Sequence, residues 1–185
     1  MNGHTILIGI GANLAPDGFN SPRAGCEAAI ASLAAHGISV ASVSPWYETA
    51  PVPVSDQPWF NNAVIRAQTA LSAVGALAAL HRVESGFGRV RTVRNAARVL
   101  DLDLLDYGAQ LVEEEGLTIP HPRLHGRAFV LLPLRDVAPD YRHPESRRPL
   151  MILLPRCPSG SRSGAPGRGL CRQVVPGAGS ACEAR

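Results

Sequence analysis

The chain has 185 residues, of which 45% are hydrophobic, so it is long enough to bury the core of one domain, and no apolar run is long enough to cross a bilayer. Its net charge of +3 is unevenly divided, because residues 1–146 carry 11 arginines and 14 acidic residues, whereas residues 147–185 carry seven arginines and one glutamate. The acidic body argues against a general nucleic-acid-binding protein. The absence of lysine excludes a P-loop nucleotide site, which needs a lysine on the phosphates.

The N-terminal region and the cysteines indicate the compartment. No basic residue precedes the first apolar run, at residues 6–10, so we expect no signal peptide. Three of the four cysteines lie in the basic tail, at a spacing that matches no zinc motif. We therefore expect a cytoplasmic protein with reduced thiols.

The first half of the chain is predicted to form three strands and one helix. A short apolar β run at residues 5–10 leads into a Gly-x-Gly turn that lacks the third glycine of a dinucleotide-binding loop. Ser21-Pro22 is typical of a helix start, and we expect this helix to end at Gly37. Alternating apolar residues predict two further strands, at residues 38–47 and 60–68.

A proline-rich segment at residues 48–59 separates these last two strands, and its three prolines exclude a regular element there. Phe60 and Asn62 follow it on one face of a strand. Core packing would explain Phe60. A buried Asn62, however, needs hydrogen-bond partners at both ends of its amide, and the edge of a heteroaromatic ring would supply them.

A second helix is predicted from a Ser72 cap to about Gly86. His81 and Glu84 are three residues apart and share a face that is not the apolar one. A solvated helix surface would explain such a pair as readily as a binding site.

Residues 94–105 are the most informative stretch. Acid and leucine alternate at residues 100–104, which predicts a strand with Asp101 and Asp103 on one face and leucines on the other. Two adjacent carboxylates repel each other unless a cation lies nearby, and Mg²⁺ prefers oxygen ligands of this kind. Four arginines precede the strand, namely Arg89, Arg91, Arg94 and Arg98. Either feature alone would fit a solvated surface, but together they favour a site for Mg²⁺ and a polyphosphate.

The predicted order β-α-β-β-α-β indicates an α+β protein with a ferredoxin-like antiparallel sheet and helices packed on it. Residues 111–119 are expected to add a β segment with an exposed acidic turn. The tail is rich in Arg, Gly, Ser and Pro. We therefore expect a body at residues 1–146 and a disordered tail at 147–185, whose abrupt change in composition suggests a frameshift product.

The motif Arg94-x-Ala-Ala-Arg98-x-x-Asp101-Leu-Asp103-Leu-Leu resembles the signature of the 6-hydroxymethyl-7,8-dihydropterin pyrophosphokinase family. The resemblance extends over residues 5–144 and includes a Pro-His pair at His121 and an Arg-x-Phe-x-Leu-x-Pro-Leu block that starts at Arg127. It implies transfer of pyrophosphate from ATP to the hydroxymethyl group of the dihydropterin in folate biosynthesis, leaving AMP.

The same resemblance implies roles for individual residues. The residues expected to be catalytic are Arg89, Arg98, Asp101 and Asp103, with the two aspartates holding two Mg²⁺ ions. The residues expected to bind the pterin are Thr49, Val52, Phe60, Asn62 and Phe129. The residues expected to bind ATP are His81, Glu84, Arg91, Arg94, His121 and Arg127.

Two other functions remain open from the sequence. One is a Mg²⁺- and ATP-dependent transferase with a different acceptor, although two aromatic residues and an asparagine favour a flat heterocycle. The other is an inactive homologue that only binds pterin or nucleotide, although the intact aspartate pair argues against decay. We expect a monomer whose partners are ATP and the pterin, with no nucleic acid or membrane among them.

Overall fold

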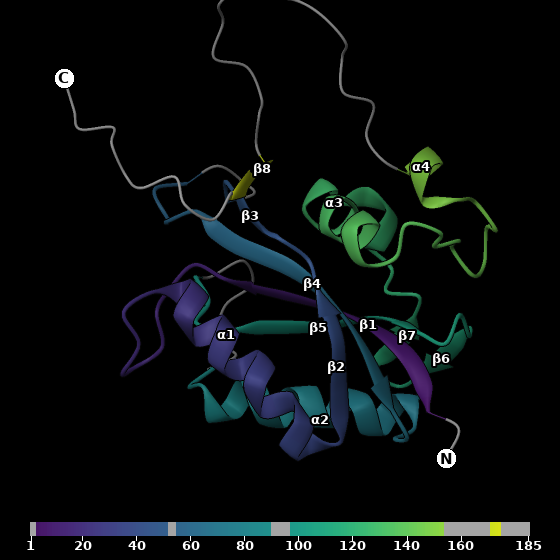
Figure 1. Cartoon of the computed structure of the whole chain (residues 1–185), viewed down its shortest axis with the longest axis horizontal. Helices are drawn as coiled ribbons and strands as arrows, with labels where there is room; N and C mark the ends of the chain where they lie inside the picture. Colours follow the sequence, from purple (N-terminus) through teal and green to yellow (C-terminus); the bar gives the residue numbers. More distant parts are fainter. Residues whose placement is uncertain (1–2, 52–54, 90–96, 154–170, 175–185) are drawn as a thin grey trace, which may run out of the picture.

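The computed structural model of the chain describes residues 3–51, 55–89, 97–153 and 171–174. Its centre is a six-stranded sheet with the order β5-β1-β4-β3-β8, in which β2 and β3 pair one after the other along the same edge of β4 (Figure 1). The strands are β1 (His4–Ala12), β2 (Ile38–Val43), β3 (Trp46–Thr49), β4 (Phe60–Thr69), β5 (Asp101–Tyr107) and β8 (Cys171–Val174). All of the described pairings in this sheet are antiparallel, which agrees with the predicted fold class.

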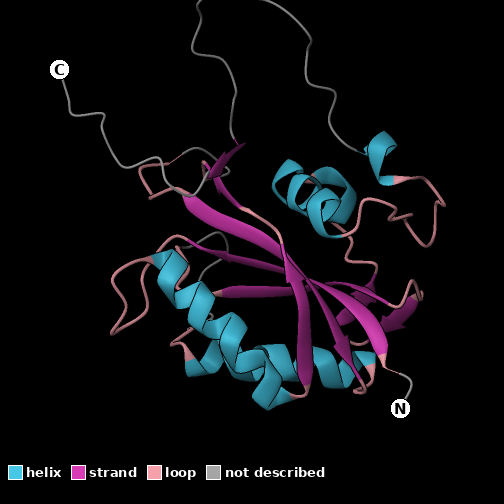
Figure 2. Cartoon of the chain, viewed as in Figure 1, coloured by secondary structure: helices cyan, strands magenta, loops and turns pink. Residues whose placement is uncertain are grey.

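Helices cover both faces of the sheet (Figure 2). The first face is covered by α1 (Pro22–Ser32), the short 3₁₀ segment η1 (Leu33–His36) and α2 (Ala73–Gly86). The second face is covered by α3 (Ala128–Val137), to which the sequence reading assigned no element, and by α4 (Leu150–Leu153). The 3₁₀ segment η2 (Leu124–Gly126) leads into α3.

Alternation along the strands produces one core on each side of the sheet. Ile6, Ile8 and Ile10 of β1 are buried on the first face together with Leu102 and Leu104 of β5. The strand residues that point to the other face form the second core. They include Leu7, Val64 and Leu105, which pack against leucines of α3. Cys26 is buried in the first core, as the sequence predicted.

Two predicted boundaries differ from the structure. The single strand expected at residues 38–47 is two strands, β2 and β3. They are separated at Ser44, whose N–H donates to the Val64 carbonyl (2.9 Å) and whose hydroxyl accepts from the Val64 N–H (3.0 Å). The α-helical part of the first helix ends at Ser32, and the 3₁₀ segment η1 follows it as far as His36. Gly37 then ends η1, and its φ of 80° requires a residue that tolerates the left-handed region.

The segment at residues 111–119 forms a small hairpin of β6 (Val112–Glu114) and β7 (Leu117–Ile119). Its turn lies at Glu115 and Gly116, and the acidic residues around it are exposed, as expected. Among the described helices, none is long and apolar enough to span a bilayer.

Two parts of the predicted tail have regular structure. Leu150 in α4 is 1% exposed and belongs to the second core. Strand β8 pairs with the outer edge of β3, with Cys171 opposite Thr49 (Figure 1). The domain boundary at residue 146 and the disorder of the tail stay predictions, and these two segments are the parts of the tail to which the structure assigns regular elements.

Candidate active site

Asp101 and Asp103 lie on the second face of the sheet, the face that α3 covers in part. Asp101 is opposite Gly11 of β1, and Asp103 is opposite Gly9. Leu102 and Leu104 point into the first core, so the alternation predicted from the sequence is confirmed. Because β1 carries glycines at these two positions, no β1 side chain stands beside the carboxylates.

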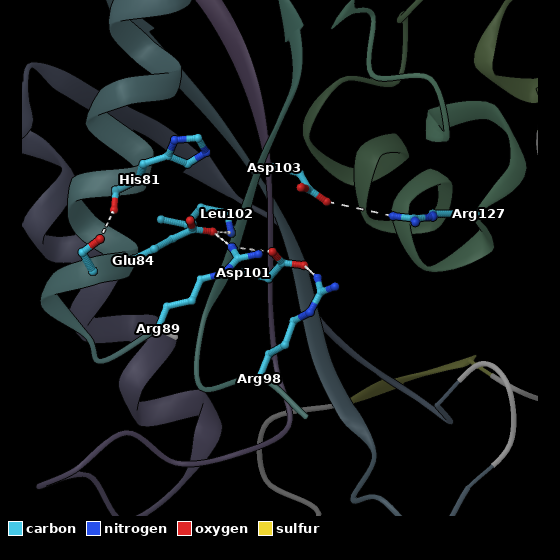
Figure 3. Close-up of polar contacts among 9 residues, drawn as sticks. His81, Glu84, Arg89, Arg98, Asp101, Leu102, Asp103 and Arg127 are labelled. Carbon is cyan, nitrogen blue, oxygen red and sulfur yellow. Dashed lines mark hydrogen bonds and ion pairs between the residues drawn. The ribbon is translucent and has the colours of Figure 1, made fainter. Parts of the chain in front are cut away.

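Two arginines hold Asp101 from both sides (Figure 3). Arg89 Nη1 lies 2.7 Å from Asp101 Oδ1, and Arg98 Nη1 hydrogen-bonds to Asp101 Oδ2. A guanidinium has five N–H donors, so each arginine keeps further donors beyond those used on the carboxylate.

Glu84 joins α2 to this cluster. Its side chain is 2% exposed, and its Oε1 accepts a hydrogen bond from the Leu102 N–H (2.7 Å) and pairs with Arg89 (Figure 3). A buried carboxylate is stabilised by such pairing. Glu84 thus fixes the position of Arg89 relative to the strand that carries the aspartates.

His81 lies one turn earlier on α2, and its carbonyl oxygen accepts from the Ser85 hydroxyl (2.9 Å). In Figure 3 its ring points from α2 toward β5. The helix face that carries His81 and Glu84 therefore faces the aspartate strand, so the solvated-surface explanation does not hold for Glu84.

The surroundings of Asp103 disfavour the ionised form of its carboxyl. Burial raises the pKa of its carboxyl, and the negative charge of Asp101 raises that pKa further. Among the described residues, Arg127 at the α3 N-terminus forms an ion pair with Asp103, at 4.0 Å (Figure 3). A divalent cation would relieve this repulsion, so the chemistry of the pair fits Mg²⁺.

The described residues hold no cluster of three or more histidine, cysteine or acidic side chains that could bind a metal ion. Asp101 and Asp103 alone would therefore offer only part of a coordination shell. Mg²⁺ commonly completes such a shell with substrate phosphates and water.

His121 follows β7 and reaches the same region. Its backbone N–H donates to the Leu105 carbonyl (2.9 Å), and its ring Nδ1 accepts from the backbone N–H of Arg123 (3.1 Å). Burial lowers the pKa of its ring, which favours the neutral form. With Nδ1 as the acceptor, the neutral ring carries its proton on Nε2 and offers a donor there. A cavity of about 410 Å³ borders His121 beside the β6–β7 hairpin.

The residues expected to bind the pterin come from three elements. Thr49 on β3 is opposite Phe60 on β4, and both share the second face with Asn62. Asn62 is buried, and its Nδ2 donates to Thr49 Oγ1 (2.8 Å). Phe129 lies at the start of α3, with the Arg127 guanidinium 5.4 Å from its ring centroid.

Asn62 finds one of its partners within the chain. Thr49 accepts from one N–H of the amide nitrogen, and the amide has a second N–H, so binding of a ring edge by Asn62 stays a prediction. The sequence could not show this pair, because it depends on the register between β3 and β4.

A family model described as 7,8-dihydro-6-hydroxymethylpterin-pyrophosphokinase (HPPK) matches residues 7–139. The chain belongs to this family. Two bacterial members are named 2-amino-4-hydroxy-6-hydroxymethyldihydropteridine pyrophosphokinase. The Pseudomonas aeruginosa protein is 40% identical over 154 residues, covering 83% of this chain and 91% of that one. The Haemophilus influenzae protein is 38% identical over 144 residues, covering 77% and 87%.

Other relatives are much longer. The folic acid synthesis protein fol1 of Schizosaccharomyces pombe is 42% identical over 123 residues, which are 66% of this chain but only 17% of that protein. The solved structure of a Plasmodium falciparum HPPK-DHPS has a TM-score of 0.64 at 14% identity, covering 82% of this chain and 44% of that one. This likeness supports the α+β fold.

Not every residue expected from the HPPK resemblance can be placed. Val52, Arg91 and Arg94 lie outside the described residues. Most of the other expected site residues lie on or beside the second face of the sheet, on β3, β4, β5 and α3 and in the segments that flank β5 and α3. His81 and Glu84 lie instead on α2, which covers the first face, and Glu84 reaches the backbone of the edge strand β5.

Sequence reasoning missed two residues that join these elements. Tyr47 on β3 donates its hydroxyl to Asp136 of α3 (2.8 Å) and so links that helix to the sheet. Asn13, just after β1, contacts both the Arg98 backbone and the end of the proline-rich segment. Its only sequence signal was its place in the Gly-x-Gly-Ala-Asn-Leu turn.

Proposed function

We propose that this HPPK-family chain transfers pyrophosphate from Mg²⁺-ATP to 6-hydroxymethyl-7,8-dihydropterin in folate biosynthesis. The hydroxymethyl oxygen would bond to the β-phosphorus of ATP, the bond to the α-phosphate would break, and AMP would leave. The alcohol proton would pass to solvent. The observation that supports this most is the register of three neighbouring strands, in which Gly11 of β1 is opposite both Asp101 of β5 and Asn62 of β4. A carboxylate and a buried amide therefore share one face of the sheet, with a glycine between them.

Asp101 and Asp103 would hold Mg²⁺, with two ions as the expected number. The metal would neutralise phosphate charge and lower the pKa of the acceptor alcohol. Arg89 and Arg98, which hold the Asp101 oxygens, would direct their remaining N–H groups at the transferring group. Phosphoryl transfer depends mainly on such positioning and charge stabilisation.

The ATP phosphates would lie between β5 and the start of α3. His121 offers a neutral Nε2–H donor, and Arg127 offers a cation 4.0 Å from Asp103. His81 and Glu84 would contribute to ATP binding from α2, with Glu84 acting through Arg89, with which it forms an ion pair. We include Arg91 and Arg94 as further ATP contacts on the strength of the motif alone.

The pterin would lie against β3 and β4. Thr49 and Asn62 would bind the ring edge, while Phe60 and Phe129 would stack on its two faces. Val52 is included on the basis of the resemblance. Phe60 and Phe129 are both half-buried, so each keeps accessible ring surface.

We also propose a monomeric enzyme in the cytoplasm with no nucleic-acid or membrane partner. The acidic body supports the absence of nucleic acid. Sedimentation of the purified chain would test the monomer, since a stable dimer at working concentrations would contradict it.

The experiment that tests the function is AMP release from Mg²⁺-ATP with and without 6-hydroxymethyl-7,8-dihydropterin. We expect AMP that depends on the pterin. Binding of both ligands without AMP would favour the inactive homologue. AMP formation that depends on a different alcohol but not on this pterin would favour a transferase with another acceptor.

A further inference from the structure

Asn13 lies between the two halves of the proposed site. It follows β1 directly, and the residue is 1% exposed. A buried amide is kept only where both of its ends are hydrogen-bonded. In Asn13 the two ends bond to two different parts of the chain.

The oxygen end of Asn13 faces the arginine–aspartate side. Its Oδ1 accepts from the Arg98 N–H (2.7 Å). The backbone N–H groups of Asn13 and Leu14 donate in turn to the Arg98 carbonyl, at 3.0 and 3.1 Å. Both peptide groups that flank the Arg98 Cα are therefore fixed, three residues before Asp101.

The nitrogen end of Asn13 faces the proline-rich segment. Its Nδ2 donates to the Pro58 carbonyl (3.2 Å) and to Gln57 Oε1 (3.3 Å). Pro58 is two residues before Phe60, so this end of the amide fixes the start of the strand that carries Phe60 and Asn62.

We infer that Asn13 is a positioning residue that couples occupancy of the pterin site to the placement of Arg98. The inference rests on the proposed function. A planar amide transmits a shift at residues 57–58 to the Arg98 backbone, because its acceptor and its donors move as one rigid group. Aspartate would keep the acceptor but lose the donors, and a hydroxyl residue would be too short to reach both sides.

The test is the coupling between the two ligands, which a merely structural residue would not change selectively. The dissociation constant of the pterin is measured by its fluorescence, with and without Mg²⁺ and an ATP analogue that has a methylene group between the α- and β-phosphorus. The ratio of the two constants is the coupling factor, and it applies equally to either ligand. The dissociation constant of the analogue alone is measured in parallel.

The informative variant is Asn13→Asp, which retains the bond from the Arg98 N–H and sets a carboxylate against the Pro58 carbonyl. We expect the coupling factor of this variant to be closer to one than that of the wild type, by about fivefold or more. The dissociation constant of the analogue alone should be unchanged. Asn20→Asp makes the same chemical change at an exposed site in the same loop and should leave the factor unchanged.

Gln57→Ala keeps the test decisive if Asn13→Asp does not fold. It removes one of the two acceptors of the Asn13 Nδ2, so we expect a smaller change of the coupling factor in the same direction. A folded Asn13→Asp or Gln57→Ala protein with the wild-type factor would overturn the inference. So would a wild type that binds both ligands with a factor of one. A wild type that binds no pterin would contradict the proposed function instead.

Discussion

Asp101 and Asn62 flank the same glycine: Gly11 of β1 is opposite Asp101 on β5 and opposite Asn62 on β4. Residues opposite one another in an antiparallel pair share a face, so all three positions face α3 rather than α1 and α2. The proposed metal residues and the proposed pterin residues are thereby held two strands apart on one rigid sheet.

This relationship makes Gly11 a sensitive position. A Cβ there would lie 2.7 Å from Asn62 Oδ1, closer than a contact allows, so Gly11→Ala should displace the amide. We expect the dissociation constant of the pterin to rise by about tenfold, the effect of one lost hydrogen bond of about 1.5 kcal/mol.

Gly9→Ala is the matched control, because its Cβ would meet Leu105 at an ordinary 3.5 Å. Its pterin affinity should be that of the wild type. Equal losses in the two variants, measured by fluorescence titration, would contradict the role given to Asn62.

The aspartate pair is expected to control turnover. Asp101→Ala and Asp103→Ala should each lower kcat by about 100-fold or more, since each removes charge stabilisation of the transferring group. Asp106 on the same strand is the control. It is buried and already bonded to the Ala109 N–H (2.9 Å) and the Tyr141 hydroxyl (3.1 Å), so Asp106→Asn should keep turnover. Near-normal kcat in either alanine variant would contradict the metal site.

Asp106 also predicts a pH dependence of stability. Burial raises the pKa of its carboxyl, so the folded state binds this proton more tightly than the unfolded state does. Its contribution to the free energy of unfolding is therefore greatest in acid and falls as the pH rises from the ordinary aspartate pKa through the raised one.

Asp106→Asn removes that ionisation while keeping an acceptor for the Ala109 N–H. Thermal melts from acid to neutral pH should show the variant gaining Tm relative to the wild type as the pH rises. A relative loss of Tm over this range would show that the charged form is the stabilised one.

Glu84 is expected to act through Arg89. Glu84→Gln keeps an acceptor for the Leu102 N–H but loses the charge that pairs with Arg89, so we expect lower kcat with a similar Tm. Glu84→Ala also leaves that N–H unpaired, which should cost about 1–3 kcal/mol of stability. Equal Tm for the two variants in a thermal melt would contradict the structural half of this role.

Leu150 tests where the folded body ends. A chain cut after residue 146 loses this buried leucine, whereas one cut after residue 153 keeps it. We expect the shorter chain, and Leu150→Ala in the full chain, to lose about 2–4 kcal/mol of stability in denaturant unfolding. If both cut chains matched the full chain, the body would end at residue 146, as the sequence suggested.

The local patterns predicted the elements that depend on one segment at a time. The Leu-Asp alternation of β5 and the caps at Ser21 and Ser72 are confirmed, because strand alternation and helix capping are short-range effects. The alternation at residues 38–47 predicts one strand through the Ser-Pro pair at residues 44–45, but this pair is the break between β2 and β3.

The long-range relationships could not be predicted. The bond between Asn62 and Thr49 needs the β3–β4 register, and the two-sided contacts of Asn13 need loops that are more than 40 residues apart in the chain. The burial of Leu150 depends on how α3 packs on the sheet, which no local pattern of residues 147–153 reveals.

The most direct measurement follows each phosphorus of ATP into the products, with ATP labelled separately at the α, β and γ positions. Pyrophosphoryl transfer by this chain predicts that the β and γ labels appear together in the pterin and the α label in AMP. A pterin that carried only the γ label, with ADP as the other product, would contradict the central claim.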